Sequence, residues 1–379
     1  MASNAFHLAV MPGEGIGPEV MDAAWAVLDA VERRFALSFR SETIPGGAHH
    51  YQETGAILPP DGLDRAGRAD AILFGAMGWP DIRFPDGTEI APQLDMRFAF
   101  DLYAGVRPIR AIPGVPTALA DPRAARIDLV IIRESTEGMF ASRGKGEVID
   151  DREARDTQVI TRATTERLTE FSCKLARRRK DARGTPGRVT LVDKSNVFRS
   201  FAFMRQVFHE AAGRHPDIEA RHHYIDAMAL DLVRRPWDFD VLPMENLFGD
   251  ILSDLGAGLI GGMGFAPSAD IGDEHGLFQP SHGTAPDIAG QGIANPTAMI
   301  LSTAMLLEWL GDRHDSQAAR DAARAVEHAV DRAFGQLGLK TYDLGGRDGT
   351  RRVGQVIAEQ IRDGAAEPKG GSERERKRR

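Results

Sequence analysis

The sequence is poor in cysteine and in long apolar runs. Among 379 residues there is one cysteine, Cys173, which can form neither an intramolecular disulfide nor a thiolate metal cluster and is expected to pack in the interior. No apolar run approaches the roughly 18 residues that span a bilayer, and the N-terminal segment MASNAFHLAVMPGEG lacks the features of a secretory signal. We therefore expect a cytoplasmic protein without a membrane partner.

The sequence also has fewer positively charged than negatively charged residues. Lys and Arg number 47 against 55 Asp and Glu, for a formal net charge of −8, and this balance argues against a general nucleic-acid surface. The exception is the end of the chain, where residues 366–379 are expected to form a disordered, charged tail. The full sequence is 42% hydrophobic, which predicts a globular protein. Its length of 379 residues predicts two domains.

Apolar patterns alternate between strand-like and helical segments. Strands are predicted near residues 6–11, 70–77, 126–134, 188–194 and 239–246, and helices at 18–35, 163–180, 198–212, 296–311 and 316–334. This alternation predicts an α/β fold with a parallel or mixed sheet. Residues 141–162 fit neither pattern and are expected to project as an arm.

The segment NLFGDILSD places Asp250 and Asp254 one helical turn apart, on one face of a predicted helix. Clustered carboxylates beside apolar residues are costly to bury unless a cation neutralises them. Two readings follow: a site for a divalent cation, or a helix with two surface aspartates.

Two glycine-rich segments could contact a ligand. Gly13, Gly15 and Gly17 follow a predicted strand and precede a helix, but the dinucleotide spacing G-x-G-x-x-G would need glycine in place of Pro18. The second segment, residues 281–296, could wrap a ligand or be a structural connection; its candidate binding residues are His282, Gly283, Thr284, Asp287 and Asn295.

Three arginines, Arg97, Arg107 and Arg133, lie near predicted strand and loop ends, and guanidinium groups bind carboxylates bidentately. Together with a possible metal site they suggest a dianionic substrate. Lys194 stands at a strand end and could act as a base if its pKa is lowered. Asp226, in an apolar context, could be a third metal ligand.

Taken together, these segments resemble the β-decarboxylating dehydrogenases, the family of isopropylmalate, homoisocitrate, isocitrate and tartrate/D-malate dehydrogenases. The resemblance runs from LAVMPGEGIGPEV to about residue 360 and is most specific in ENLFGDILSDLGAGLIGGMGFAPSADIGD and SHGTAPDIAGQGIANP. It implies a two-domain fold with the active site in the interdomain cleft. The expected domains are 1–103 with 261–365, which bind the cofactor, and 104–260, which carry the dimerisation elements.

The resemblance also implies roles for the candidate residues. Asp250 and Asp254 match the Mg²⁺ or Mn²⁺ ligands, and Asp226 and Lys194 match a ligand and a base that complete the partner subunit's site in a homodimer. The three arginines match those that hold a hydroxy dicarboxylate substrate, and His282, Gly283, Thr284, Asp287 and Asn295 match the adenosine-binding loop. A carboxylate at Asp287 would repel a 2′-phosphate, which favours NAD over NADP.

Two positions depart from the family pattern. Phe140, in RESTEGMF, stands where most catalytic members have a tyrosine that protonates the enolate left by decarboxylation. Gln93, with the neighbouring Ile90, makes a poor pocket for an isopropyl group. We therefore predict oxidation of a (2R)-malate-type substrate by NAD with β-decarboxylation. The alternatives are a family member that does not decarboxylate, a non-catalytic regulatory member, and an unrelated phosphate-binding protein.

Overall fold

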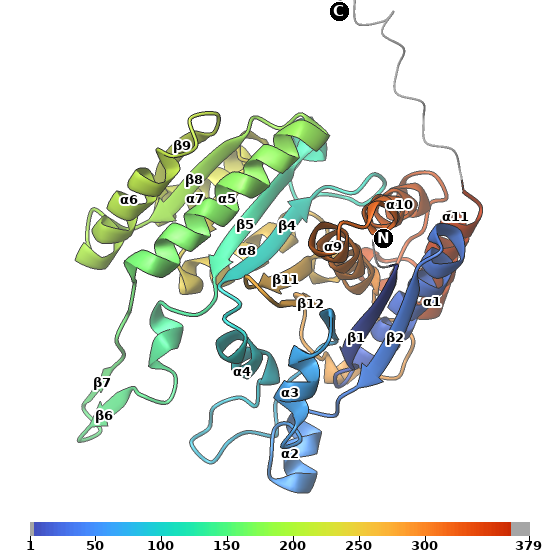
Figure 1. The fold of residues 1–379 in the computed structure, drawn as a ribbon, viewed down its shortest axis with the longest axis horizontal. Coiled ribbons are helices and arrows are strands. Elements are labelled where there is room, and N and C mark those ends of the chain that lie inside the picture. Colours follow the sequence, from blue (N-terminus) through green and yellow to red (C-terminus); the bar gives the residue numbers. More distant parts are fainter. Residues whose placement is uncertain (1–3, 365–379) are drawn as a thin grey trace, which may run out of the picture.

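Ten strands form one mixed sheet in a computed structural model that describes residues 4–364 (Figure 1). The predicted charged tail, 366–379, lies outside these residues. From one edge to the other the strands are β2 (Ser38–Thr43), β1 (Ala5–Met11), β3 (Ala71–Phe74), β12 (Gly276–Pro280), β11 (Pro267–Ile271), β4 (Ala104–Arg110), β5 (Asp128–Glu134), β10 (Val241–Met244), β8 (Arg188–Asp193) and β9 (Glu219–Tyr224).

The sheet consists of two parallel blocks joined by antiparallel pairs at its centre. Strands β12, β11, β4 and β5 pair antiparallel in succession, whereas the remaining neighbours pair parallel. Because both ends of the chain supply the block that contains β1, helices α1 (Gly17–Phe35) and α11 (Thr350–Arg362) pack against each other. The α/β class predicted from the sequence is confirmed.

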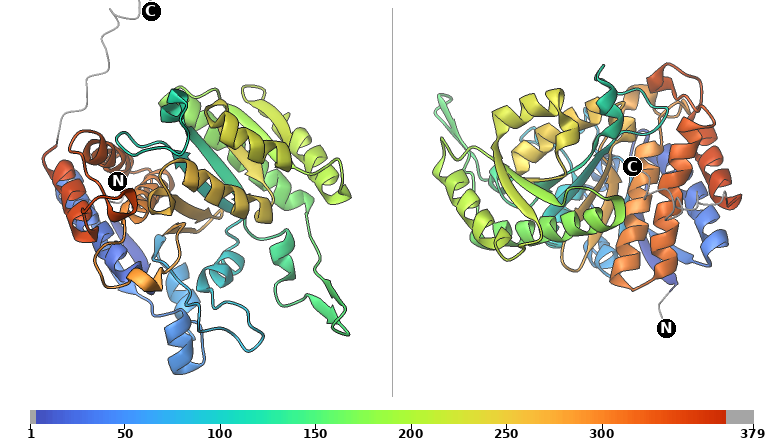
Figure 2. Two further views of the ribbon diagram at one scale, coloured as in Figure 1. Left: turned by 180° about the vertical axis from the view of Figure 1, so that it is seen from behind. Right: turned by 90° about the horizontal axis from the view of Figure 1, so that it is seen from above.

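Helices cover both faces of the sheet (Figures 1 and 2). Besides α1 and α11, the helices of the described residues are α2 (Ala48–Thr54), α3 (Gly62–Gly67), α4 (Pro92–Ala99), α5 (Arg162–Arg183), α6 (Arg199–Ala212), α7 (Ile225–Arg234), α8 (Asn246–Leu259), α9 (Thr297–Arg313) and α10 (Gln317–Gly335). Local sequence explains their ends: Thr161 caps α5 by accepting a hydrogen bond from the N–H of Thr164, and Gly184 ends it with a φ of 69°.

Strands β3 and β10 are buried along their whole length, which explains their continuous apolar sequences AILF and VLPM. Strand β4 begins at Ala104 and helix α8 ends at Leu259, close to the two points where the sequence predicted a change of domain. The division into 1–103 with 261–365 and 104–260 stays a prediction, since the sheet runs through both parts without a break.

Residues 141–162 include a hairpin of β6 (Glu147–Ile149) and β7 (Glu153–Arg155), which pair antiparallel and extend away from the sheet (Figure 1). Val148 on this hairpin is 76% exposed. An exposed apolar side chain on a projecting hairpin is typical of a surface that meets another chain.

Within residues 4–364, none of the helices combines the length and apolar character that crossing a membrane would need.

Candidate active site

A cavity of about 310 Å³ lies beside the carboxyl ends of β3, β5 and β12 and the amino end of β11, between α4 and α8. Its walls come from segments far apart in the sequence: Gly75, Ala76, Met77, Glu89, Ala91, Gln93, Leu94, Arg97, Arg107, Arg133, Phe140, Asp250, Ser253, Asp254, Ser268, Gln279, Pro280, Ser281, His282 and Gly283. The structure thus brings together the three predicted arginines, both helix aspartates, Gln93 and the start of the second glycine-rich segment.

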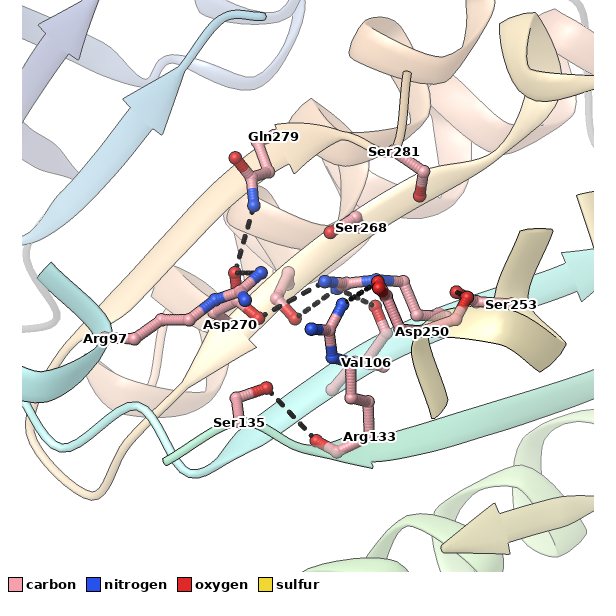
Figure 3. Close-up of polar contacts among 12 residues, drawn as sticks. Arg97, Val106, Arg133, Ser135, Asp250, Ser253, Ser268, Asp270, Gln279 and Ser281 are labelled. Carbon is pink, nitrogen blue, oxygen red and sulfur yellow. Dashed lines mark hydrogen bonds and ion pairs between the residues drawn. The ribbon is translucent and has the colours of Figure 1, made fainter. Parts of the chain in front are cut away.

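The three arginines are almost completely buried, each 4–5% exposed. Arg97 Nη2 lies 3.0 Å from Asp270 Oδ2, and Arg107 Nη2 lies 3.4 Å from Asp270 Oδ1. Figure 3 shows the Asp270 carboxylate beside Arg97, with Gln279 donating a hydrogen bond to it from the other side, at 3.0 Å. Burial opposes ionisation of Asp270, but the positive charges of Arg97, Arg107 and Arg133 outweigh it and lower its pKa.

Arg133 has different partners. Its Nη1 pairs with Asp250 and its Nε donates to Asn246 Oδ1 at 2.8 Å. Burial, followed by the positive charge of Arg97, lowers the pKa of Arg133 to about 10, so it stays charged at neutral pH. One of the two helix aspartates is therefore already tied to a buried arginine.

Asp254 has no hydrogen-bond or ion-pair partner within the described part of the chain, although it lines the same cavity. Loss of solvent around its carboxyl group, together with the negative charge of Asp250, raises its pKa. An unpaired carboxylate beside a second one is the arrangement that a bound cation relieves.

Asp250 and Asp254 suit Mg²⁺ or Mn²⁺, but one chain supplies only part of the ligands that such an ion needs. Asp250 and Asp254 present hard oxygen ligands to one cavity. No three His, Cys, Asp or Glu side chains come together in a metal-binding group in residues 4–364. The remaining ligands must then be water, substrate or a residue of another chain.

The two glycine-rich segments lie side by side. The N–H of Ile16 donates to the carbonyl oxygen of Thr284 at 2.8 Å, and a Cβ at Gly15, whose φ is 59°, would lie 2.1 Å from that oxygen. A Cβ at Gly13, whose φ is 90°, would likewise lie 2.1 Å from the carbonyl oxygen of Ala76. Gly13 and Gly15 are thus required by contacts within the protein. The hydrogen bond between Ile16 and Thr284 joins the two glycine-rich segments beside the cavity, which His282 and Gly283 line.

Residues predicted to bind the cofactor differ in their surroundings. His282 and Gly283 line the cavity, and burial lowers the pKa of His282, which keeps its imidazole neutral at pH 7. Thr284 is buried and donates its hydroxyl hydrogen bond to Gly78 O, while the Asn295 amide donates to Asp343. Asp287 is exposed at the start of a 3-10 turn, Pro286–Ile288.

Lys194 and Asp226 do not line the cavity formed by the described residues of this chain. They pair with each other instead, Lys194 Nζ donating to Asp226 Oδ1 at 2.7 Å, and the carboxylate is largely exposed. Neither residue therefore contributes to the wall of its own chain's cavity.

The sequence did not predict several residues of the site: Ser253, Ser268 and Gln279, which line the cavity, and Asp270, which pairs with two of its arginines. Asp270 carried a usable signal, because it is the one charged residue in the otherwise apolar strand PSADI. Ile90 was expected beside the substrate, but it is completely buried and does not line the cavity; Ala91, Gln93 and Leu94 do.

Phe140 borders the cavity, and the guanidinium carbon of Arg133 lies 4.9 Å from the centre of its ring. No tyrosine lines the cavity in residues 4–364. The described lining therefore contains no phenol that could donate a proton.

Comparison with known proteins decides the family. The sequence model of the isocitrate/isopropylmalate dehydrogenase family matches residues 7–358. The chain belongs to this family. It is 41% identical over 357 residues to 3-isopropylmalate/3-methylmalate dehydrogenase of Methanocaldococcus jannaschii, a match that covers 94% of this chain and 99% of that protein.

Solved structures agree with this family. The isocitrate dehydrogenase of Methylococcus capsulatus superposes with a TM-score of 0.82 at 36% identity, covering 94% of this chain and 99% of that one. A β-decarboxylating dehydrogenase of Thermococcus kodakarensis gives a TM-score of 0.76 at 38% identity, with 94% and 96% covered. The isocitrate/isopropylmalate dehydrogenase-like fold is confirmed, and the protein is a hydroxy-acid dehydrogenase.

Proposed function

We propose that this dehydrogenase oxidises a (2R)-malate-type 2-hydroxy dicarboxylate with NAD and Mg²⁺ or Mn²⁺, and that β-decarboxylation follows. The observation that carries the proposal is the single cavity in which Arg97, Arg107 and Arg133 face Asp250 and Asp254. Buried guanidinium groups recognise carboxylates, and paired aspartates recognise a divalent cation. A hydroxy dicarboxylate needs both.

Each residue then has a defined task. The arginines hold the substrate carboxylates in a water-poor site, where their charges are poorly screened. Lys194 of the partner subunit removes the hydroxyl proton, directly or through water, and Asp226 of the partner subunit adds a carboxylate to the metal ligands. NAD supplies the hydride acceptor, and the metal ion supplies a Lewis acid for the carbonyl oxygen.

NAD, rather than NADP, is the cofactor we propose because Asp287 is a carboxylate exposed on the adenosine-side loop. Such a group accepts hydrogen bonds from ribose hydroxyls, whereas a 2′-phosphate beside it would meet a like charge. The neutral imidazole of His282 and the main chain of Gly283 lie where this loop reaches the cavity.

A polar substituent on the substrate is supported by Gln93. Its Oε1 is buried and has no hydrogen-bond partner among residues 4–364, although it belongs to the cavity wall. An unpaired buried acceptor is costly, and a hydroxyl group on the substrate would satisfy it. Malate, tartrate and related hydroxylated diacids therefore fit this wall better than a branched alkyl chain.

Phe140 favours a second candidate function, oxidation without decarboxylation, because a phenyl ring donates no proton. We retain decarboxylation as the first proposal because the two metal-ligand candidates and Lys194 are present. A non-catalytic regulatory role is disfavoured for the same reason.

A homodimer is part of the proposal. Lys194 and Asp226 lie outside this chain's cavity, so they act only if they reach a partner's site. Helices α7 and α8 also expose large apolar side chains, with Leu230 at 56% and Ile251 at 59% exposed. Apolar side chains on two adjacent helices suit a helix-to-helix interface between subunits.

The deciding experiment is a panel of D-malate, the tartrate isomers, 3-isopropylmalate and isocitrate, each with Mn²⁺ and either NAD or NADP. NADH and CO₂ are quantified in the same reaction. NADH from a malate-type diacid supports the proposal; no reduction with any hydroxy acid under these conditions would refute it.

A further inference from the structure

Asp270 is a fully buried carboxylate that touches two of the three cavity arginines. It lies on β11 in register with Gly105 of β4. A Cβ at Gly105 would lie 3.1 Å from Asp270 Oδ1 and 2.6 Å from Ser135 Oγ. Because Gly105 has no side chain, there is room for the charged group of Asp270 in the centre of the sheet.

The contacts of Asp270 fix the two arginines. Arg97 directs one terminal nitrogen to Asp270, and Arg107 directs one to Asp270 and the other to the carbonyl oxygens of Val106 and Ala269. Arg97 Nε is buried and has no hydrogen-bond partner in the described part of the chain. The two guanidinium groups are therefore held in place, and Arg97 keeps an N–H donor at Nε that is unpaired within the described residues.

Asp270 also changes the charge of the cavity. Three buried guanidinium groups are balanced by the carboxylates of Asp250, Asp254 and Asp270, while Glu89 is exposed at the rim. The partner's Lys194 and the partner's Asp226, which the proposed function adds to the site, carry opposite charges that cancel. A divalent cation on Asp250 and Asp254 would therefore leave two positive charges in excess. That excess matches a dicarboxylate dianion, whereas a fully ionised tricarboxylate would bring one negative charge too many.

We propose that Asp270 is a specificity-determining residue that sets the cavity to accept a dicarboxylate dianion and to reject a tricarboxylate. This inference rests on the proposed function, because it assumes that the cavity binds a hydroxy acid with a divalent cation. It goes beyond that function by assigning the choice of substrate charge to one buried side chain that does not itself take part in the chemistry.

Asp270→Asn removes the charge, keeps the size of the side chain and retains one oxygen acceptor. Binding of D-malate and of isocitrate is measured by calorimetry with Mn²⁺ and without nicotinamide cofactor, so that no turnover occurs. We expect the wild type to bind D-malate at least about tenfold more tightly. In Asp270→Asn we expect that preference to fall by at least about tenfold, equivalent to ~1.4 kcal/mol.

Asp240→Asn is the matched control. Asp240 is also buried and accepts a hydrogen bond from Arg179 Nε at 2.8 Å, but it does not line the cavity. Asp240→Asn should lower the stability of the protein. The ratio of the D-malate and isocitrate affinities should stay within about twofold of the wild-type ratio, because this substitution changes no charge in the site. Thermal unfolding of both variants monitors folding.

The outcomes separate this inference from the proposed function. An unchanged preference in a folded Asp270→Asn variant would overturn the role of Asp270, even if the enzyme makes NADH. Should the variant fail to fold, the wild type still decides, because equal or tighter binding of isocitrate, or no binding of either acid, would overturn it. Absence of NADH from every hydroxy acid instead refutes the function, whatever the binding preference.

Discussion

Replacing Phe140 by tyrosine tests the point at which this protein departs most from its family. The change adds one hydroxyl group at the edge of a ring that already borders the cavity. The ring keeps its contact with the Arg133 guanidinium, whose carbon lies 4.9 Å from the ring centre and which contributes about 0.5–1 kcal/mol in typical cases. Substrate binding should therefore change little, by less than about threefold in KM.

The expected gain lies in proton donation. A well-placed general acid accelerates proton transfer by about 10²–10⁴-fold, and no tyrosine lines the cavity in residues 4–364. If the enolate of the wild type is protonated so slowly that CO₂ adds back and the oxo diacid leaves instead, Phe140→Tyr should raise CO₂ per NADH toward one. The rate of NADH formation should change little, because hydride transfer precedes these steps.

NADH is followed by absorbance and CO₂ by trapping in the same vessel, with the best substrate of the panel. Phe140→Leu is the control, since it loses the ring without gaining a donor and should weaken binding without raising CO₂. A wild type that already releases one CO₂ per NADH, at a rate that Phe140→Tyr does not change, would refute the reasoning. No CO₂ from either enzyme, with the oxo diacid recovered, would instead support the non-decarboxylating alternative.

Three further outcomes are expected. Asp254→Asn should abolish Mn²⁺ binding measured by calorimetry while the protein stays folded, because Asp254 has no hydrogen-bond or ion-pair partner to lose among residues 4–364. In the wild type, Mn²⁺ affinity should fall as pH is lowered through the raised pKa of Asp254, since protons compete with the cation. NAD should exceed NADP at least about tenfold in kcat/KM, and Asp287→Ala should narrow this ratio. Mixing inactive Lys194→Ala with inactive Asp254→Asn should restore roughly a quarter of wild-type activity, since mixed dimers contain one intact site.

Each of these outcomes has a contrary result. Mn²⁺ binding by Asp254→Asn as tight as in the wild type, or full activity of this variant after chelator treatment with metal withheld, contradicts the metal assignment. Equal use of NADP by the wild type removes the argument from Asp287. No recovery on mixing, after subunit exchange is verified by mass, would mean that Lys194 serves its own chain's cavity or none.

The sequence predicted those parts of the fold whose patterns are local. The strand at 188–194 and the helix at 163–180 follow directly from apolar periodicity and end at polar or glycine residues. Strand β4 was missed because its run AGVRPIR contains two arginines and a proline, and only burial between β11 and β5 makes it a central strand. Non-local pairing of this kind leaves little trace in a short window.

The candidate site was predicted unevenly for a similar reason. Asp250 and Asp254 share one helix, so their spacing alone brings them together, and the arginines followed from the resemblance. Asp270 escaped because its partners, Arg97 and Arg107, lie more than 160 residues away in the sequence. The roles of all these residues, the domain boundaries and the cytoplasmic location stay predictions.

The strand order has a consequence for how the chain is made. Strand β12 lies between β3 and β11, yet it is synthesised about two hundred residues after β3. Strands β5, β10, β8 and β9 all fall within residues 128–224 and 241–244 and can pair with one another earlier. During synthesis, the edge of β3 that pairs with β12 therefore stays unpaired while β5, β8, β9 and β10 fold. An open edge of this kind is prone to pair with other chains, so truncations that end before Gly276 should aggregate rather than yield a stable N-terminal fragment.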